Sequence, residues 1–147
     1  DQRFDYSVLG DSVNLASRLE GQSKSYGVKT VIGPETNESV KGSYATLQLD
    51  MIAVKGKKEA VTIFTLVGDS NFKESSEFKN LEKNHIKILD LYFNQKWQDC
   101  LIEIETAKVL CNNLMSEYYE IMSTRIKEFK KSPPPNNWDG VYVATSK

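Results

Sequence analysis

Asn14 and Arg18 are the two residues whose types and spacing most directly suggest chemistry. They lie four residues apart in FDYSVLGDSVNLASRLEG, residues 4–21, and therefore share one face of the helix predicted there. An amide and a guanidinium presented together form a rigid set of hydrogen-bond donors, which suits a polyphosphate or charge that grows on a phosphoryl group. The alternative is a solvated helix face, although no acidic residue three or four positions away can pair with Arg18. Spacing alone leaves both interpretations open.

Other kinds of chemical site find little support in the sequence. His85 is the only histidine and lies among Lys and Asn in a helical pattern, so it predicts a structural or surface role rather than a hydrolase triad or a metal site. No GxxxxGK(S/T) phosphate loop is present. Cys100 and Cys111 fall 11 residues apart in a predicted helical region, too far apart for a disulfide, which favours a reducing compartment.

Length, charge and hydropathy indicate a globular unit. The chain has 147 residues, 39% of them hydrophobic, and a net charge of -1, so it has no general attraction for nucleic acid. The basic tract RIKEFKK, residues 125–131, is expected to be a solvated helix end. No apolar run reaches the roughly 20 residues that span a bilayer, and the first residues do not resemble a signal peptide. Because the chain begins without Met, we expect it to be cut from a longer protein.

The elements that must position Asn14 and Arg18 alternate between strand and helix. Apolar alternation and turn residues predict strands, and capping residues with a 3.6-residue period predict helices. The predicted order is strand 4–9, a helix from about residue 12, strand 28–33, helix 34–40, and strands 44–54 and 60–67 joined by KGKKE. This order predicts an α+β or α/β domain over residues 1–68.

Residues 69–147 have a helical period and form the second predicted region. A helical hairpin broken at NQK is followed by a third helix over about 113–130, which ends at SPPPNNWDG. The aromatic spacing resembles about one and a half tetratricopeptide repeats, whereas a solenoid needs about three repeats for stability. These helices must therefore pack against something else.

Two motifs resemble the class III nucleotidyl cyclases, the adenylate and guanylate cyclases. DYSVLGDSVNLASRLEG, residues 5–21, has Gly10, Asn14 and Arg18 at the family spacing, and IAVKGKKEAVTIFTL, residues 52–66, resembles a second motif. The likeness covers about residues 1–67 and implies the C-terminal half of a ferredoxin-like cyclase catalytic domain. The remaining residues would be an all-α helical extension.

The resemblance implies a role for each matching residue. Asn14 is similar to the asparagine that positions the ribose, and Arg18 to the arginine that stabilises charge on the phosphate as the 3'-hydroxyl attacks. Ser7 falls where a side chain reads the purine, a position that is Asp in many adenylate cyclases and Thr in a bacterial subset. Lys55 and Lys57 lie where the family places a lysine on the triphosphate, and the choice between them stays open.

The family chemistry implies further partners. The intact protein would convert ATP into cyclic AMP and pyrophosphate as a homodimer, with two Mg or Mn ions. Their ligands are expected outside this chain, because neither Asp5 nor Asp11 matches the family's metal-binding aspartates. The fragment alone should therefore be inactive. We expect a cytoplasmic location, either free or as the cytoplasmic portion of a membrane-anchored bacterial protein, with no membrane contact from this segment.

Two other functions remain open at this stage. One is a guanylate cyclase, and the other is a degenerate cyclase-like domain that binds a regulatory partner. The tail PPPNNWDGVYVATSK, residues 133–147, resembles the end of bacterial sensor-linked cyclases, and Trp138 and Tyr142 are expected to dock it on the helices. Truncation after Val67 is expected to alter dimerisation or regulation more than the chemistry.

Overall fold

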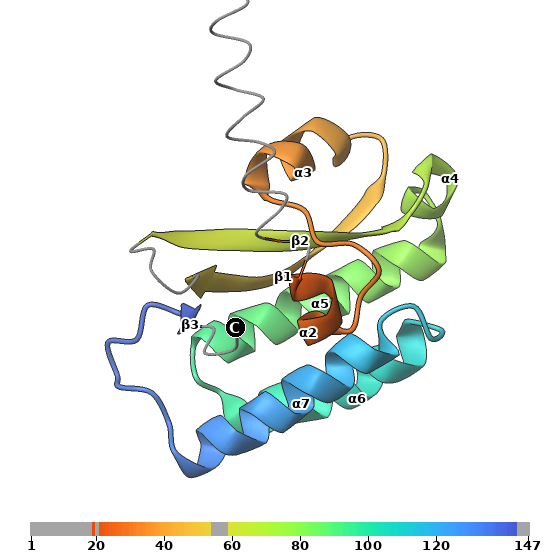
Figure 1. Cartoon of the computed structure of the whole chain (residues 1–147). Helices are drawn as coiled ribbons and strands as arrows, with labels where there is room; N and C mark the ends of the chain where they lie inside the picture. The colour runs from red at the N-terminus through yellow and green to blue at the C-terminus, as the bar shows by residue number, and fades with distance from the viewer. Residues whose placement is uncertain (1–18, 20, 54–58, 144–147) are drawn as a thin grey trace, which may run out of the picture.

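A three-stranded sheet with helices on both sides organises the part of the chain that the computed structural model describes, which is residues 19, 21–53 and 59–143 (Figure 1). The strand order is β2-β1-β3. In Figure 1, α3 lies on one side of the sheet, and α5, α6 and α7 lie on the other. The predicted α+β class is confirmed.

The central strands form the antiparallel hairpin that the sequence predicts. Strand β1 spans Ala45–Ala53 and strand β2 spans Ala60–Gly68. Their register shifts between Gln48 and Asp50, so Leu49 is an extra residue on β1. A bulge of this kind breaks the alternation of faces. Leu49 and Asp50 are consequently both buried, one directly after the other.

The segment before the hairpin is partly different from the prediction. Helix α2 spans Gln22–Tyr26, and helix α3 spans Pro34–Val40 as predicted, with Pro34 in its first turn. The predicted strand over 28–33 is wrong. Only Ile32 makes a bridge there, exchanging two backbone hydrogen bonds of 2.9 Å with Phe64. Such a short pairing does not extend the sheet.

The predicted helices of the C-terminal region are confirmed. Helix α5 spans Ser76–Phe93, α6 spans Trp97–Leu110 and α7 spans Ser116–Lys131. A short helix that was not predicted, α4, precedes them at Ser70–Lys73. Helix α7 begins later than predicted because Asn112 and Asn113 have φ values of 48° and 71°. This left-handed conformation cannot belong to an α-helix. Cys100 and Cys111 are both buried, and both are free thiols.

The helices pack on the sheet, which supplies the partner that the sequence required. One hydrophobic core contains side chains from β1, β2, α5, α6 and α7. Its members include Leu47, Leu49, Ile52 and Ile63 from the strands and Leu81, Ile88, Ile104, Tyr118, Tyr119 and Met122 from the helices. The resemblance to a tetratricopeptide repeat is not confirmed. The division into two domains at residue 68 remains a prediction. The apolar core crosses that boundary.

The C-terminal tail returns to the sheet. After α7, the Trp138 ring packs against Tyr92, Trp97 and Phe129, with ring centroids 5.4, 6.1 and 5.5 Å away. Strand β3, Tyr142–Val143, then pairs in parallel with β1 at Ile52 and Ala53. The predicted docking of the tail is therefore present, although Tyr142 lies at the edge of the sheet.

His85 has a structural role between the sheet and the helices. Its ring is 1% exposed, its Nε2 lies 2.5 Å from the carbonyl oxygen of Gln48, and its Nδ1 lies 2.8 Å from the hydroxyl of Tyr119. A carbonyl only accepts hydrogen bonds, so Nε2 carries the proton and Nδ1 accepts from Tyr119. Burial lowers the pKa of His85 from 6.5 to about 4.

The depressed pKa of His85 makes stability depend on pH. Between pH 6.5 and about pH 4, His85 is protonated in the unfolded chain but neutral in the folded chain. The free energy of unfolding should therefore decrease as the pH is lowered from 6.5 to about 4. The loss is about 3 kcal/mol at most. Urea unfolding at pH 7, 5.5 and 4.5 measures it. His85→Gln keeps one donor and one acceptor without titrating, and it should show a shallower slope; an equal slope would contradict this assignment.

The shared core predicts that truncation after Val67 abolishes folding. The sequence alone had led us to expect a change in dimerisation or regulation instead. The remaining strands would expose Leu47, Leu49 and Ile63, which are at most 3% exposed in the full chain. We expect the truncated chain to aggregate and to lose its cooperative thermal transition by circular dichroism. Truncation after Val143 keeps every described contact and serves as the control. A truncated chain that melts cooperatively would refute the shared core.

Candidate active site

The five residues predicted to form the site lie outside the described part of the chain. They are Ser7, Asn14 and Arg18 near the start, and Lys55 and Lys57 between β1 and β2. The structure therefore neither brings them together nor separates them. It does describe the segment that follows Arg18 and the two strands that flank Lys55 and Lys57.

The segment that follows Arg18 is fixed in the core. Leu19 is helical and 1% exposed, and it belongs to the hydrophobic core of the sheet and helices. Helix α2 begins three residues later and ends at Tyr26, which is 2% exposed. Gly27 then terminates α2 with a φ of 64°, a left-handed conformation that glycine adopts without strain.

The end of β1, just before the connection that carries Lys55 and Lys57, is paired with a strand on each side. Ala53, the last residue of β1, pairs with Ala60 of β2 and with Val143 of β3. Two neighbouring strands therefore fix the direction in which the chain leaves β1. Pairing of this kind also sets the register of the two strands at the turn.

A buried ion pair lies three residues before Ala53, the last residue of β1. The Asp50 side chain is 0% exposed, and the Nη1 of Arg125 in α7 donates to its Oδ2 at 2.6 Å. The Tyr26 hydroxyl donates to the same oxygen at 2.6 Å, and the Met51 backbone amide donates to Oδ1 at 2.8 Å. The predicted solvated helix end is thus wrong for Arg125, whose side chain is only 10% exposed.

Aromatic rings complete the surroundings of the guanidinium. Arg125 also donates to the Tyr92 hydroxyl at 3.1 Å, and its Cζ lies 3.5 Å from the Tyr142 ring centroid. A guanidinium over an aromatic face gains from the ring's negative quadrupole. We call Tyr26, Asp50, Tyr92, Arg125 and Tyr142 the Arg125 cluster. It joins α2, β1, α5, α7 and β3 through side chains alone.

Burial governs the electrostatics of this cluster. It raises the pKa of Asp50, while the Arg125 charge and the hydrogen bonds from Tyr26, Arg125 and Met51 favour the carboxylate. Burial also raises the pKa of Tyr26 and of Tyr92, so both phenols keep their protons. Burial opposes the charge of Arg125, but Asp50 and the tyrosines outweigh it and raise the pKa of Arg125. The carboxylate and the guanidinium compensate each other in a nearly dry environment.

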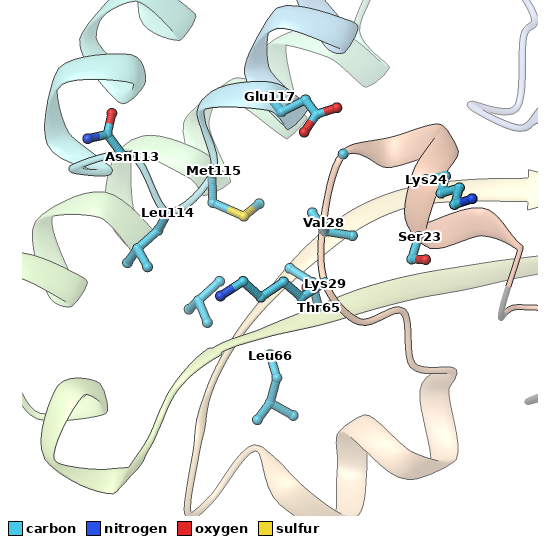
Figure 2. A pocket seen from close by; sticks show the side chains of 12 residues that line it. Ser23, Lys24, Val28, Lys29, Thr65, Leu66, Asn113, Leu114, Met115 and Glu117 are labelled. Carbon is cyan, nitrogen blue, oxygen red and sulfur yellow. The ribbon is translucent and has the colours of Figure 1, made fainter.

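An open cavity lies beside α2, between the end of β2 and the connection from α6 to α7 (Figure 2). Its volume is about 720 Å³, and Lys29 and Glu117 line opposite sides of it in Figure 2. At its rim, Gly27 is so close to α7 that a Cβ there would lie 2.5 Å from Cγ of Glu117. Side chains of both charges line this cavity, which favours no single class of ligand.

Metal binding and membrane spanning are not evident in the described ranges. Within residues 19, 21–53 and 59–143, no three His, Cys, Asp or Glu side chains form a group that could hold a metal ion. No helix of that part is long and apolar enough to cross a bilayer.

Two charged residues within apolar patterns are the sequence signal for the Arg125 cluster. Asp50 is a charge inside the apolar strand LQLDMIAV, and Arg125 follows Tyr118 and Met122 on the apolar stripe of α7, just before Ile126. A lone charge on a buried face requires a partner of opposite charge. These two residues are 75 positions apart, so pairing them required the tertiary structure.

Comparison with known proteins addresses the first half of the chain. Residues 1–68 match the family model of the adenylate and guanylate cyclase catalytic domain. The chain is 42% identical over 65 residues to an adenylate cyclase of Anabaena cylindrica and 34% identical over 67 residues to adenylate cyclase 1 of Rhizobium meliloti. These alignments cover 42% and 46% of this chain.

A third relative matches a longer part of the chain. It is a terminal-differentiation specific adenylate cyclase of Dictyostelium discoideum, 31% identical over 119 residues, or 78% of this chain. The chain spans 13%, 10% and 5% of the Anabaena, Rhizobium and Dictyostelium proteins. No solved structure matches the chain.

Removing Arg125 should destabilise the chain strongly. Arg125→Met leaves the buried Asp50 carboxylate without its counter-charge, and breaking a buried pair in this way costs about 3–5 kcal/mol. Lys127→Met, at an exposed position of the same helix, should change the free energy of unfolding by less than about 0.5 kcal/mol. The double variant Asp50→Asn/Arg125→Met should recover part of the loss. Equal urea midpoints for Arg125→Met and Lys127→Met would contradict the pairing.

Proposed function

Because residues 1–68 belong to the adenylate and guanylate cyclase catalytic-domain family, we propose that the chain is the C-terminal part of an adenylate cyclase. The intact protein would convert ATP into cyclic AMP and pyrophosphate for intracellular signalling. The match of residues 1–68 to the family carries this proposal. Three relatives named as adenylate cyclases support ATP as the substrate.

The proposed reaction assigns Arg18 and Asn14 to the reacting groups. The ribose 3'-oxygen forms a bond to the α-phosphorus, the bond from that phosphorus to the leaving pyrophosphate oxygen breaks, and the hydroxyl proton is released. Arg18 donates hydrogen bonds to the phosphate oxygens, whose charge increases in the transition state. Asn14 holds the ribose so that its 3'-oxygen faces the phosphorus, which lowers the entropic cost of the step.

Three further residues are proposed to bind the nucleotide. The Ser7 hydroxyl would hydrogen-bond the purine, and Lys55 or Lys57 would bind the triphosphate with its ammonium group. When bound, two Mg or Mn ions would neutralise the phosphates and activate the 3'-hydroxyl. Their ligands are proposed to lie outside this chain, so the fragment alone would be inactive. We also propose a homodimer formed through the catalytic domain and a cytoplasmic location for this segment.

The described flanks of the site are consistent with these assignments. Leu19 and Tyr26 tie the segment after Arg18 into the core, and Ala53 is paired on both sides just before the connection that carries Lys55 and Lys57. Positioning a reacting group depends on such rigid neighbours.

Guanylate cyclase is the second candidate function. The matching family includes guanylate as well as adenylate cyclases. Ser7 also differs from the Asp found in many adenylate cyclases at the position where the purine is read. The product formed from GTP separates the two functions.

Arg18→Ala in the parent protein, which must contain the upstream catalytic half, should lower turnover roughly 10²- to 10³-fold, the usual cost of a lost transition-state donor. The measurement is cyclic AMP and cyclic GMP formed from ATP and GTP in the presence of Mn. Arg3→Ala removes an arginine outside the motif and is the matched control.

Near-normal turnover in Arg18→Ala would remove Arg18 from the mechanism. Preferential formation of cyclic GMP would favour guanylate cyclase. A folded dimeric parent that forms neither product would favour the cyclase-like binding module.

A further inference from the structure

We propose that Arg125 is a positioning residue for the cyclase reaction. From α7 it holds two described segments that lie close in sequence to the predicted site residues: α2, which begins four residues after Arg18, and β1, which ends two residues before Lys55. This inference rests on the proposed function. It assigns the helical extension a part in arranging the active site.

The first link runs through Tyr26 towards Arg18. The Tyr26 hydroxyl donates to Asp50 at 2.6 Å, and the Nη2 of Arg125 donates to the same hydroxyl at 3.4 Å. The Tyr26 ring also stacks on Tyr118 of α7, with centroids 6.5 Å apart. Tyr26 ends the short helix α2, which begins three residues after Leu19. Helix α7 therefore restrains the segment that follows Arg18.

The second link runs through β1 towards Lys55 and Lys57. Helix α7 makes two contacts at the bulge of β1, because Arg125 binds Asp50 and the Tyr118 hydroxyl donates to the carbonyl of Leu49 at 2.6 Å. A bulge re-aims the residues that follow it. The contacts with Leu49 and Asp50 therefore help to set the direction of the last residues of β1.

The tail adds a third contact to the same strand. The Tyr142 ring covers the Arg125 guanidinium at 3.5 Å, and its backbone pairs with Ile52 of β1. Trp138 fixes the start of this return by packing on Tyr92 and Trp97. Arg125 thus lies where α7, the bulge and the tail meet.

The chemistry of this cluster requires arginine in particular. A planar guanidinium can donate to Asp50, Tyr92 and Tyr26 while its face stacks on Tyr142. A lysine ammonium keeps the charge but has neither the fork nor the flat face. A buried pair of charges contributes little net stability compared with apolar side chains, so a role in fixing a specific arrangement accounts better for its presence.

Loss of this arrangement should reduce the rate even in folded protein. Displacing a reacting group by about 1 Å can cost on the order of 10²-fold in rate. We therefore expect Arg125→Lys in the full-length parent protein to lower kcat/KM about 10- to 100-fold. The assay is run with ATP and Mn at a temperature where circular dichroism shows every variant to be folded.

The matched control is a core residue outside the Arg125 cluster. Ile104 of α6 is 0% exposed, so Ile104→Ala weakens the core without removing a member of the cluster. Ile104→Val replaces it if the Ala variant does not fold. We expect kcat/KM of the folded control to stay within about threefold of wild type, because its lost contact is one of general packing.

Coupling to Arg18 separates positioning from general stability. If Arg125 acts by placing Arg18, then Arg125→Lys should lower kcat far less in an Arg18→Ala background than in wild type. Purely structural damage would lower kcat by the same factor in both backgrounds.

Each outcome decides the inference. An active wild type with a normal Arg125→Lys variant, or an equal loss in the Ile104 control, would overturn it and leave the proposed function intact. Additive effects with Arg18→Ala would overturn the placement of Arg18 through Tyr26. A folded wild type that forms no cyclic nucleotide would overturn the proposed function and this inference together.

Discussion

The Asp50 carboxylate is the constraint on which the rest of the structure depends. Asp50 is fully buried in β1, between apolar residues. A buried charge is costly unless it is paired and hydrogen-bonded. Arg125, 75 residues further along the chain, supplies the counter-charge. This requirement brings α7 against β1, and α7 brings with it the tail that covers Arg125. The N-terminal and C-terminal regions are consequently joined by a specific polar contact as well as by apolar burial.

The bulge in β1 turns this contact into an anchor for both halves. It buries the adjacent side chains of Leu49 and Asp50 and leaves carbonyl groups that the helices satisfy. His85 of α5 donates to Gln48, and Tyr118 of α7 donates to Leu49, so three successive residues of β1 are bonded to helices. Helices α5 and α7 therefore supply the hydrogen-bond partners of these three residues. An extension of this kind is part of the folding unit even though the cyclase family match ends at residue 68.

Local patterns in the sequence predicted most elements, because periodicity and turn residues are local signals. The hairpin strands, α3 and the three long helices follow from them. Residues 28–33 are apolar enough for a strand, but pairing only at Ile32 leaves a single bridge. Arg125 was misassigned because its basic neighbours Lys127, Lys130 and Lys131 are exposed, while its own position falls on the buried stripe of α7. For the site, the motif around Asn14 and Arg18 led to the family, whereas the Asp50 pairing depends on tertiary contacts.

Amide hydrogen exchange measured by mass spectrometry tests most directly whether the two regions form one cooperative unit. Because β1, β2, α5 and α7 share a core and are joined by the Arg125 cluster, their peptides should open with similar free energies. Arg125→Met should lower the protection of all of them together. Retained protection of α5, α6 and α7 while β1 and β2 exchange freely would contradict the account. The helices would then be a separate unit placed beside the cyclase segment.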